Sequence, residues 1–205
     1  MITLAIDTST TRGAVAVLDN DQLVGEEFFG RDGLFDAIER LQPGNFELLV
    51  VGVGPGSFTG IRAGLAAAKG LALPRAVPIR AVNSFDVLAV TALPALPATC
   101  RQMCVIGDAR RGEIYSALYD RAGKPKRVCQ LGTLPALTGE LREPTWLLSA
   151  EMDRYASQLT GEFCIAPVFP SAAVLGRLGL ADPSTLPLEP IYLRTTEYRT
   201  VTIPA

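Results

Sequence analysis

The sequence contains no histidine, and this absence removes several kinds of chemistry from consideration. A Ser-His-Asp triad and a Cys-His pair both need an imidazole as general base, so neither mechanism can operate here. Zinc sites with histidine ligands are excluded for the same reason, and the side chain that most often titrates near neutral pH is missing. Any chemistry therefore has to rest on carboxylates, hydroxyls, lysine, arginine or backbone amides.

Other features are scarce as well. No CxxC pair occurs among the four cysteines, Cys100, Cys104, Cys129 and Cys164. Their spacing favours buried thiols in a reducing compartment over a metal site or a disulfide framework. No apolar run reaches the length of a membrane span, and the opening MITLAIDTST is typical of a strand and not of a signal peptide. We therefore expect a cytoplasmic protein without a membrane partner. The net charge of -2 gives no sign of autonomous binding to nucleic acid.

The chain repeats itself. The stretches AIDTSTTRGAVAVLD (residues 5–19) and VIGDARRGEIYSALYD (residues 105–120) each combine a strand, an aspartate, a polar turn, a glycine and a second strand. Each continues as three strands followed by alternating helices and strands, and a proline-containing segment without periodicity, residues 93–99, separates the copies. The repeat predicts an α/β chain of two duplicated βββαβα lobes, residues 1–99 and 100–205.

Two such lobes, each with an acidic turn after its first strand, are characteristic of the actin-like ATPase (ASKHA, ribonuclease H-like) fold. In that fold the two turns face each other across a cleft and contact nucleotide phosphates and metal. The corresponding residues here are Asp7, Thr8, Ser9, Thr10, Asp108 and Arg110. Arg110 and Arg111 are expected to pair with Asp108 or with an anion, and no Gly-Gly adenosine motif follows in the second half. We interpret these residues as a vestigial nucleotide cleft in which the aspartates stabilise the turns.

The segment GPGSFTGIRAGLAAAKGLA, residues 54–72, at first looks like a phosphate-binding loop that opens a helix. A P-loop needs a lysine directly after its second glycine, whereas Gly60 is followed by Ile61, and Lys69 comes much later in the helix. We therefore reject the P-loop and expect a strand-to-helix turn capped by Ser57 or Thr59. An anion at this helix N-terminus is the less favoured alternative.

The helix after this turn, from about residue 56 to 73, is apolar almost all round. Ile61, Leu65, Ala68 and Ala72 form one face, and small residues form most of the rest. A surface helix is normally apolar along a single stripe, so this helix must be covered on two sides. One cover is its own sheet. The pattern leaves open whether the other is a helix of the same chain or another protein.

Four motifs together carry a resemblance to a known family. LAIDTST, VGVGPGSFTGIRAGLAAAKGLA, DARRGEIY and PIYLR occur in this order between Leu4 and Arg194. They resemble the TsaB (YeaZ) family, a bacterial subunit needed for the threonylcarbamoyl modification of adenosine 37 in tRNA, and the second motif is the most specific. The chain departs from the family in its first helix, since FFGRDGLFDAIERL lacks the His-Ser-Glu motif that many members carry there.

The resemblance implies a non-catalytic scaffold that binds and activates a TsaD-type paralogue through the first lobe, and that forms a homodimer through the same helices when alone. A TsaE-type ATPase belongs to the larger complex, and tRNA is reached only through that complex. No catalytic residue, metal or resident cofactor is implied, and ATP or ADP with Mg²⁺ is expected only at the interface of the assembled complex. The expected interface residues are Leu34, Ile38, Ser57, Phe58, Thr59, Ile61, Arg62, Leu65, Ala68, Lys69 and Ala72.

Two other functions stay open. The chain is alternatively an active ATPase or small-molecule kinase of the actin-like fold. A peptidase, the older label of the family, has less support, because no nucleophile–base pair or metal-ligand cluster is visible in the sequence.

Overall fold

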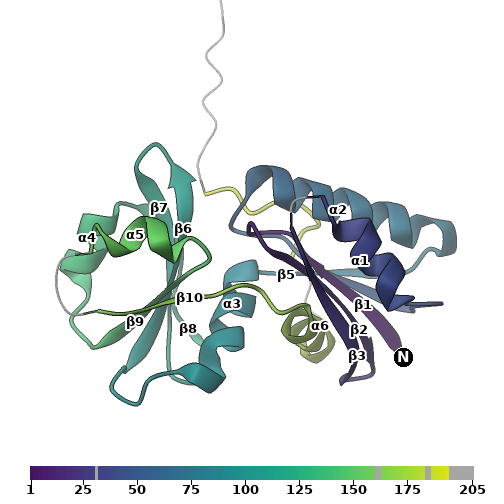
Figure 1. The fold of residues 1–205 in the computed structure, drawn as a ribbon, viewed down its shortest axis with the longest axis horizontal. Helices are drawn as coiled ribbons and strands as arrows, with labels where there is room; N and C mark the ends of the chain where they lie inside the picture. The colour runs from purple at the N-terminus through teal and green to yellow at the C-terminus, as the bar shows by residue number, and fades with distance from the viewer. Residues whose placement is uncertain (31, 160–162, 183–185, 194–205) are drawn as a thin grey trace, which may run out of the picture.

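The computed structural model describes residues 1–30, 32–159, 163–182 and 186–193. These residues form two five-stranded mixed sheets, flanked and separated by helices (Figure 1). Among them, no helix combines the length and the apolar character that crossing a membrane requires.

The first sheet has the strand order β3-β2-β1-β4-β5. Its strands are β1 (Ile2–Asp7), β2 (Gly13–Asp19), β3 (Gln22–Phe29), β4 (Leu48–Gly52) and β5 (Ile79–Val82). The helices of this half are α1 (Leu34–Leu41), α2 (Phe58–Ala72) and α3 (Ser84–Ala92). β1 runs antiparallel to β2 and parallel to β4. Every residue of β4 is buried, as expected of a parallel strand covered on both faces.

The second sheet repeats the same order and the same strand directions as β8-β7-β6-β9-β10. Its strands are β6 (Gln102–Arg110), β7 (Glu113–Tyr119), β8 (Pro125–Gly132), β9 (Thr145–Ser149) and β10 (Cys164–Pro167). The helices are α4 (Leu134–Glu140), α5 (Met152–Ala156) and α6 (Ala172–Ala181). The predicted duplication is confirmed, and each copy is longer than predicted, with the element order βββαβαβα.

The last helix of each half packs on the sheet of the other half. α1 and α2 cover one face of the first sheet, while α6 covers the opposite face. The approach of α6 is close, because a β-carbon at Gly176 would lie 2.5 Å from Leu18, and one at Gly179 would lie 2.5 Å from Val50. α3 packs on the second sheet, whose other face is covered by α4 and α5. α3 and α6 therefore lie between the two sheets (Figure 1). The division into lobes at residues 99 and 100 stays a prediction.

Candidate functional site

Three glycines, one in the loop before α2 and two in the helix itself, bring α2 into direct contact with the turn between β1 and β2. A β-carbon at Gly56 would lie 2.2 Å from the Ser9 carbonyl oxygen. A β-carbon at Gly60 would lie 2.1 Å from the Thr8 carbonyl oxygen, and one at Gly64 would lie 2.2 Å from the Thr8 hydroxyl. Such distances are far shorter than any real carbon–oxygen contact. Because the close atom is backbone at Gly56 and Gly60, only glycine fits at these two positions, whereas at Gly64 the Thr8 hydroxyl would have to move. The glycines that suggest a phosphate loop in the sequence serve instead to pack the helix against its own chain.

Hydrogen bonds fix the same contact. The Ser57 side chain caps α2 by accepting from the Gly60 amide at 3.2 Å, and the Ser57 amide donates to the Ser9 carbonyl at 2.7 Å. The Thr8 hydroxyl donates to the Gly60 carbonyl at 2.8 Å. Of the two capping residues that the sequence suggests, Ser57 is the cap, and Thr59 lies exposed in the first turn.

Asp7 is the last residue of β1, and its carboxyl group is fully buried. Its Oδ1 accepts from the Ser9 amide at 2.8 Å, and Oδ2 lies against Gly52, where a β-carbon would be only 2.1 Å away. Burial raises the pKa of Asp7, and hydrogen bonds from Ser9 and Ser84 oppose that rise. The carboxyl group is thus enclosed between β1, β4 and the start of α3.

A cleft of about 620 Å³ lies between the two halves of the molecule. On one side it is lined by the β1–β2 turn and the start of α2, and on the other by the β6–β7 hairpin and residues 149–151. The structure places four of the six predicted cleft residues on its wall: Ser9, Thr10, Asp108 and Arg110. Asp7 and Thr8 are buried behind this wall.

The Asp108 carboxylate is engaged by two guanidinium groups. Arg110 Nη1 lies 3.1 Å from its Oδ2, and Arg154 forms a second ion pair with the same oxygen. Its Oδ1 accepts from the Arg110 amide at 2.8 Å. The hairpin tip holds Arg110 and Arg111 at φ values of 65° and 57°, a backbone region that arginine seldom adopts. No cluster of three metal-binding side chains occurs within residues 1–30, 32–159, 163–182 and 186–193.

α2 has one buried and one exposed face. The four residues that the sequence analysis grouped as one face, Ile61, Leu65, Ala68 and Ala72, are buried in the core against the first sheet. We call the opposite side the α2 outer face; it consists of Thr59, Arg62, Ala63, Ala66, Lys69, Gly70 and the adjoining Leu73. Any other molecule that meets this helix must contact the outer face, because the buried face is already filled by the chain itself.

α1 lies on the same side of the first sheet as α2, and it too has one buried and one exposed face. Leu34 and Ile38 are buried beneath the helix, whereas Phe35 is 62% exposed. Phe58 and Leu73, at the two ends of α2, are 54% and 79% exposed. Sequence reasoning missed the exposed residues Phe35, Ala63, Ala66, Gly70 and Leu73. The signal that identifies them is their helical spacing from the buried positions.

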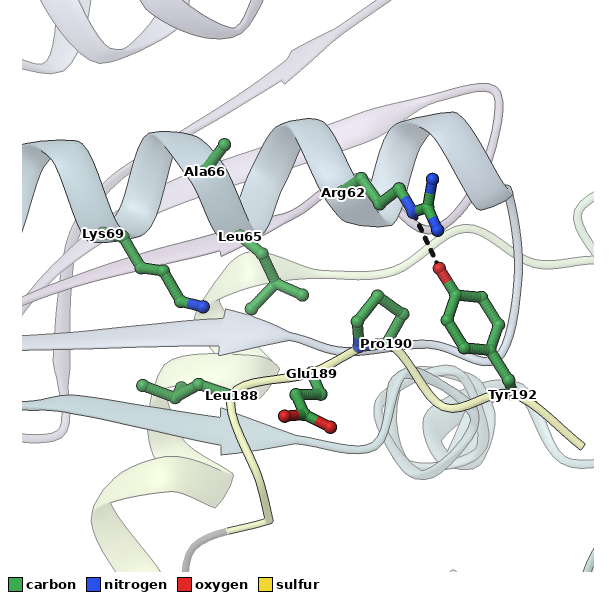
Figure 2. Close-up of a pocket in the computed structure, with 8 residues that line it drawn as sticks. All are labelled: Arg62, Leu65, Ala66, Lys69, Leu188, Glu189, Pro190 and Tyr192. Atoms are coloured by element: carbon green, nitrogen blue, oxygen red, sulfur yellow. Dashed lines mark hydrogen bonds between the residues drawn. The ribbon is translucent and has the colours of Figure 1, made fainter.

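The segment 186–193 returns to the first half and lies beside α2. The Ile191 amide donates to the Val53 carbonyl at 2.9 Å. Arg62 Nε donates to the Tyr192 hydroxyl at 2.8 Å, and the same guanidinium lies 3.8 Å from the centre of the Phe58 ring. A hollow of about 430 Å³ lies between α2 and the segment. Figure 2 shows Arg62 and Tyr192 among the side chains that line it. The structure thus brings the GPGSFTGIR and PIYLR motifs together, although Arg194 lies outside the described residues.

Residues 36–130 match the family model described as TsaD, tRNA N6-adenosine threonylcarbamoyltransferase. The chain is also similar to the tRNA threonylcarbamoyladenosine biosynthesis protein TsaB of Escherichia coli, with 37% identity over 58% of this chain and 54% of the relative. The chain matches the TsaD/YeaZ (TsaB) family. This confirms the resemblance seen in the motifs. The chain spans little more than half the length of this relative and of several other curated relatives.

Solved structures agree on the fold of this chain. YeaZ from Pseudomonas aeruginosa superposes with a TM-score of 0.73 at 20% identity, over 94% of this chain and 99% of that one. An inorganic polyphosphate/ATP-glucomannokinase from an Arthrobacter species reaches a TM-score of 0.50 at 12% identity, over 88% and 98% of the two chains. At these identities the likeness is one of fold, and the predicted actin-like fold class is confirmed.

Proposed function

We propose that this chain is a non-catalytic scaffold and activating subunit in the synthesis of N6-threonylcarbamoyladenosine in tRNA. In this proposal it binds a TsaD-type threonylcarbamoyltransferase through its first half. The observation that carries the proposal is the α2 outer face, a helix surface made largely of small residues that its own chain leaves exposed. The name of the related TsaB protein supports the assignment to this modification.

The chemistry of the outer face suits a partner helix. Ala63, Ala66 and Gly70 let a second backbone approach closely, so that a modest area can pack at the density of a protein core. Leu73 adds an exposed apolar anchor at the C-terminal end of this surface, and Phe35 of α1 is a second exposed apolar side chain in the same half. α2 has 15 residues and is about 22 Å long, which suits an interface of standard size.

The two aspartates of the actin-like turns support a role without catalysis. Mg²⁺ in a phosphoryl-transfer site needs carboxylate oxygens that also face phosphates and water. Asp7 is enclosed away from the cleft, and Asp108 already pairs with Arg110 and Arg154. We therefore propose that ATP or ADP with Mg²⁺ enters only at the interface of the assembled complex. A TsaE-type ATPase joins that complex, tRNA binds through it, and the chain alone forms a homodimer through the same helices.

The cleft between the halves is the observation that favours the second candidate, an active ATPase or small-molecule kinase. A purified chain that hydrolyses ATP, and that loses this activity on Asp7→Ala, would establish the second candidate and overturn the first.

The scaffold proposal is tested by co-purification with the cognate TsaD-type protein. Ala66→Glu places a charge at the centre of the α2 outer face, where binding would have to bury it unpaired. We expect affinity to fall by about a hundredfold or more, equal to about 3 kcal/mol. The variant should still fold, because Glu is a good helix former at an exposed position, and circular dichroism checks this.

The matched control is Ala136→Glu, which makes the same change at an exposed alanine of α4 in the other half. This variant should bind like the unmodified chain. Full binding by Ala66→Glu would show that the partner contacts a different surface, and loss of binding in both variants would point to a general effect of the added charge.

A further inference from the structure

The hollow of about 430 Å³ beside α2 has two walls. The helix supplies the first wall, with residues that recur at helical spacing: Arg62, Leu65, Ala66 and Lys69. The segment 186–193 supplies the second wall: Leu188, Glu189, Pro190 and Tyr192. Figure 2 shows the helix along one side of the hollow and the segment along the other. Arg62, Ala66 and Lys69 also belong to the α2 outer face, so the hollow is continuous with that surface.

The second wall is attached to the core of the first half. The Ile191 amide donates to the Val53 carbonyl at 2.9 Å, and the side chains of Leu188 and Ile191 pack against the buried cluster of the first sheet. At its far end the Tyr192 hydroxyl accepts from Arg62 Nε at 2.8 Å. The hollow is therefore formed in the chain alone, so an occupant does not have to order the segment first.

The lining combines apolar side chains with a positive charge. Leu65 is buried, and Leu188 and Pro190 are half-buried, so the least exposed part of the lining is apolar. Lys69 and Glu189 are both exposed, and neither forms an ion pair with another residue in the part of the chain that the structure describes. The α2 wall thus presents the charge of Lys69 to any molecule that enters.

We propose that the hollow receives a bulky apolar side chain of the TsaD-type partner, and that a carboxylate of the partner next to this side chain pairs with Lys69. The inference rests on the proposed function and adds the segment 186–193 to the partner surface. An opposite charge is what an unpaired ammonium at the rim of an interface favours in a partner.

The place and the size of the hollow support this occupant. A helix that packs along Ala63, Ala66 and Gly70 lies beside the opening of the hollow, because Ala66 belongs to both surfaces. Small residues at that contact bring the partner backbone close enough for one of its side chains to enter. The volume of about 430 Å³ lies within the range of pockets that enclose whole small ligands, so a bulky side chain fits.

The two parts of the proposal predict different kinetics of binding. An apolar side chain that fills a pocket acts mainly by slowing dissociation, whereas a charge at the rim acts mainly by speeding association. The test therefore measures association and dissociation rates of the full chain on the immobilised TsaD-type partner, at low and at high salt.

Leu188→Ala removes apolar surface from the second wall. We expect the dissociation rate to rise by about tenfold and the association rate to change little. Circular dichroism checks the fold, because Leu188 also packs against the core. Pro190→Ala removes apolar surface from the same wall and takes the place of Leu188→Ala if that variant does not fold.

Lys69→Gln removes the charge of the first wall at an exposed position, where the fold does not depend on it. We expect the association rate to fall by about fivefold at low salt and the salt dependence of binding to become weaker. Lys69→Arg keeps the charge and should bind like the unmodified chain.

Two control variants repeat these changes outside the hollow. Leu186→Ala removes an exposed leucine of the same segment that does not line the hollow. Lys124→Gln removes an exposed charge from the turn between β7 and β8 in the other half. Both controls should bind with the rates of the unmodified chain.

The proposal requires both effects, so unchanged kinetics in either the segment variant or Lys69→Gln would overturn it. If Ala66→Glu still loses binding in that case, the proposed function stands without this inference. Full binding by Ala66→Glu, or no binding by the unmodified chain, would overturn both. Sedimentation of the same variants without the partner tests a second copy of this chain as the occupant: weaker self-association with unchanged partner binding would also overturn the proposal.

Discussion

Replacement of Gly60 by alanine is expected to lower the free energy of unfolding by about 3 kcal/mol. The added methyl group would lie 2.1 Å from the Thr8 carbonyl oxygen, which is backbone and cannot rotate away. The helix would have to move off the β1–β2 turn and lose the hydrogen bond from the Thr8 hydroxyl to the Gly60 carbonyl. Urea denaturation followed by circular dichroism measures the effect.

Gly70→Ala is the matched control in the same helix. No atom lies within 4 Å of a β-carbon built at Gly70, so alanine should stabilise the helix by about 1 kcal/mol through its higher propensity. The two substitutions are chemically identical, and they should therefore change stability in opposite directions. A similar effect at both positions would mean that helix propensity, and not contact with the turn, decides the role of Gly60.

The duplication could be predicted from the sequence because local patterns occur twice. The two strand–aspartate–turn–glycine–strand stretches indicated the repeated βββαβα unit. A polar residue just before a helix is also a readable signal, and Asn83 caps α3 by accepting from the amides of Phe85 and Asp86.

Helix α4 has no clear local signal in its own sequence, LPALTGE, because it contains a proline and a glycine that usually indicate a loop. Pro135 stands in the first turn, where the absent amide hydrogen has no helical partner to lose. Thr133 provides the cap, with its hydroxyl 3.4 Å from the Ala136 amide.

The orientation of α2 could not be read from its sequence. Small residues occupy nearly its whole circumference, so hydrophobicity does not distinguish the side that faces the sheet. The decisive signal is steric: Gly60 and Gly64 are four residues apart and mark the side of α2 that contacts the β1–β2 turn. The packing of α6 on the first sheet depends on contacts between distant parts of the chain that no local pattern contains.

Asp7→Asn is expected to stabilise the chain at neutral pH and to leave its stability nearly unchanged in acid. The pKa of Asp7 is 3.8 in an unfolded chain, and burial raises it in the folded state. Below pH 3.8 the carboxyl group is protonated in both states and carries no penalty. As the pH rises further, the unfolded chain ionises freely while the folded chain retains the proton, so stability falls by about 1.4 kcal/mol per pH unit until the folded pKa is reached.

Asparagine escapes this loss because it does not ionise, and its side-chain oxygen can still accept from the Ser9 amide. The difference in unfolding free energy between Asp7→Asn and the unmodified chain should therefore grow above about pH 4. It should level off at the pKa of Asp7 in the folded chain, so the pH at which the plateau begins measures that pKa. Glu39→Gln, at an exposed carboxylate of α1, is the control for a general change in net charge. A difference for Asp7→Asn that stays constant between pH 3 and pH 8 would contradict the burial of an ionisable group at this position, since only a shifted pKa makes the difference depend on pH.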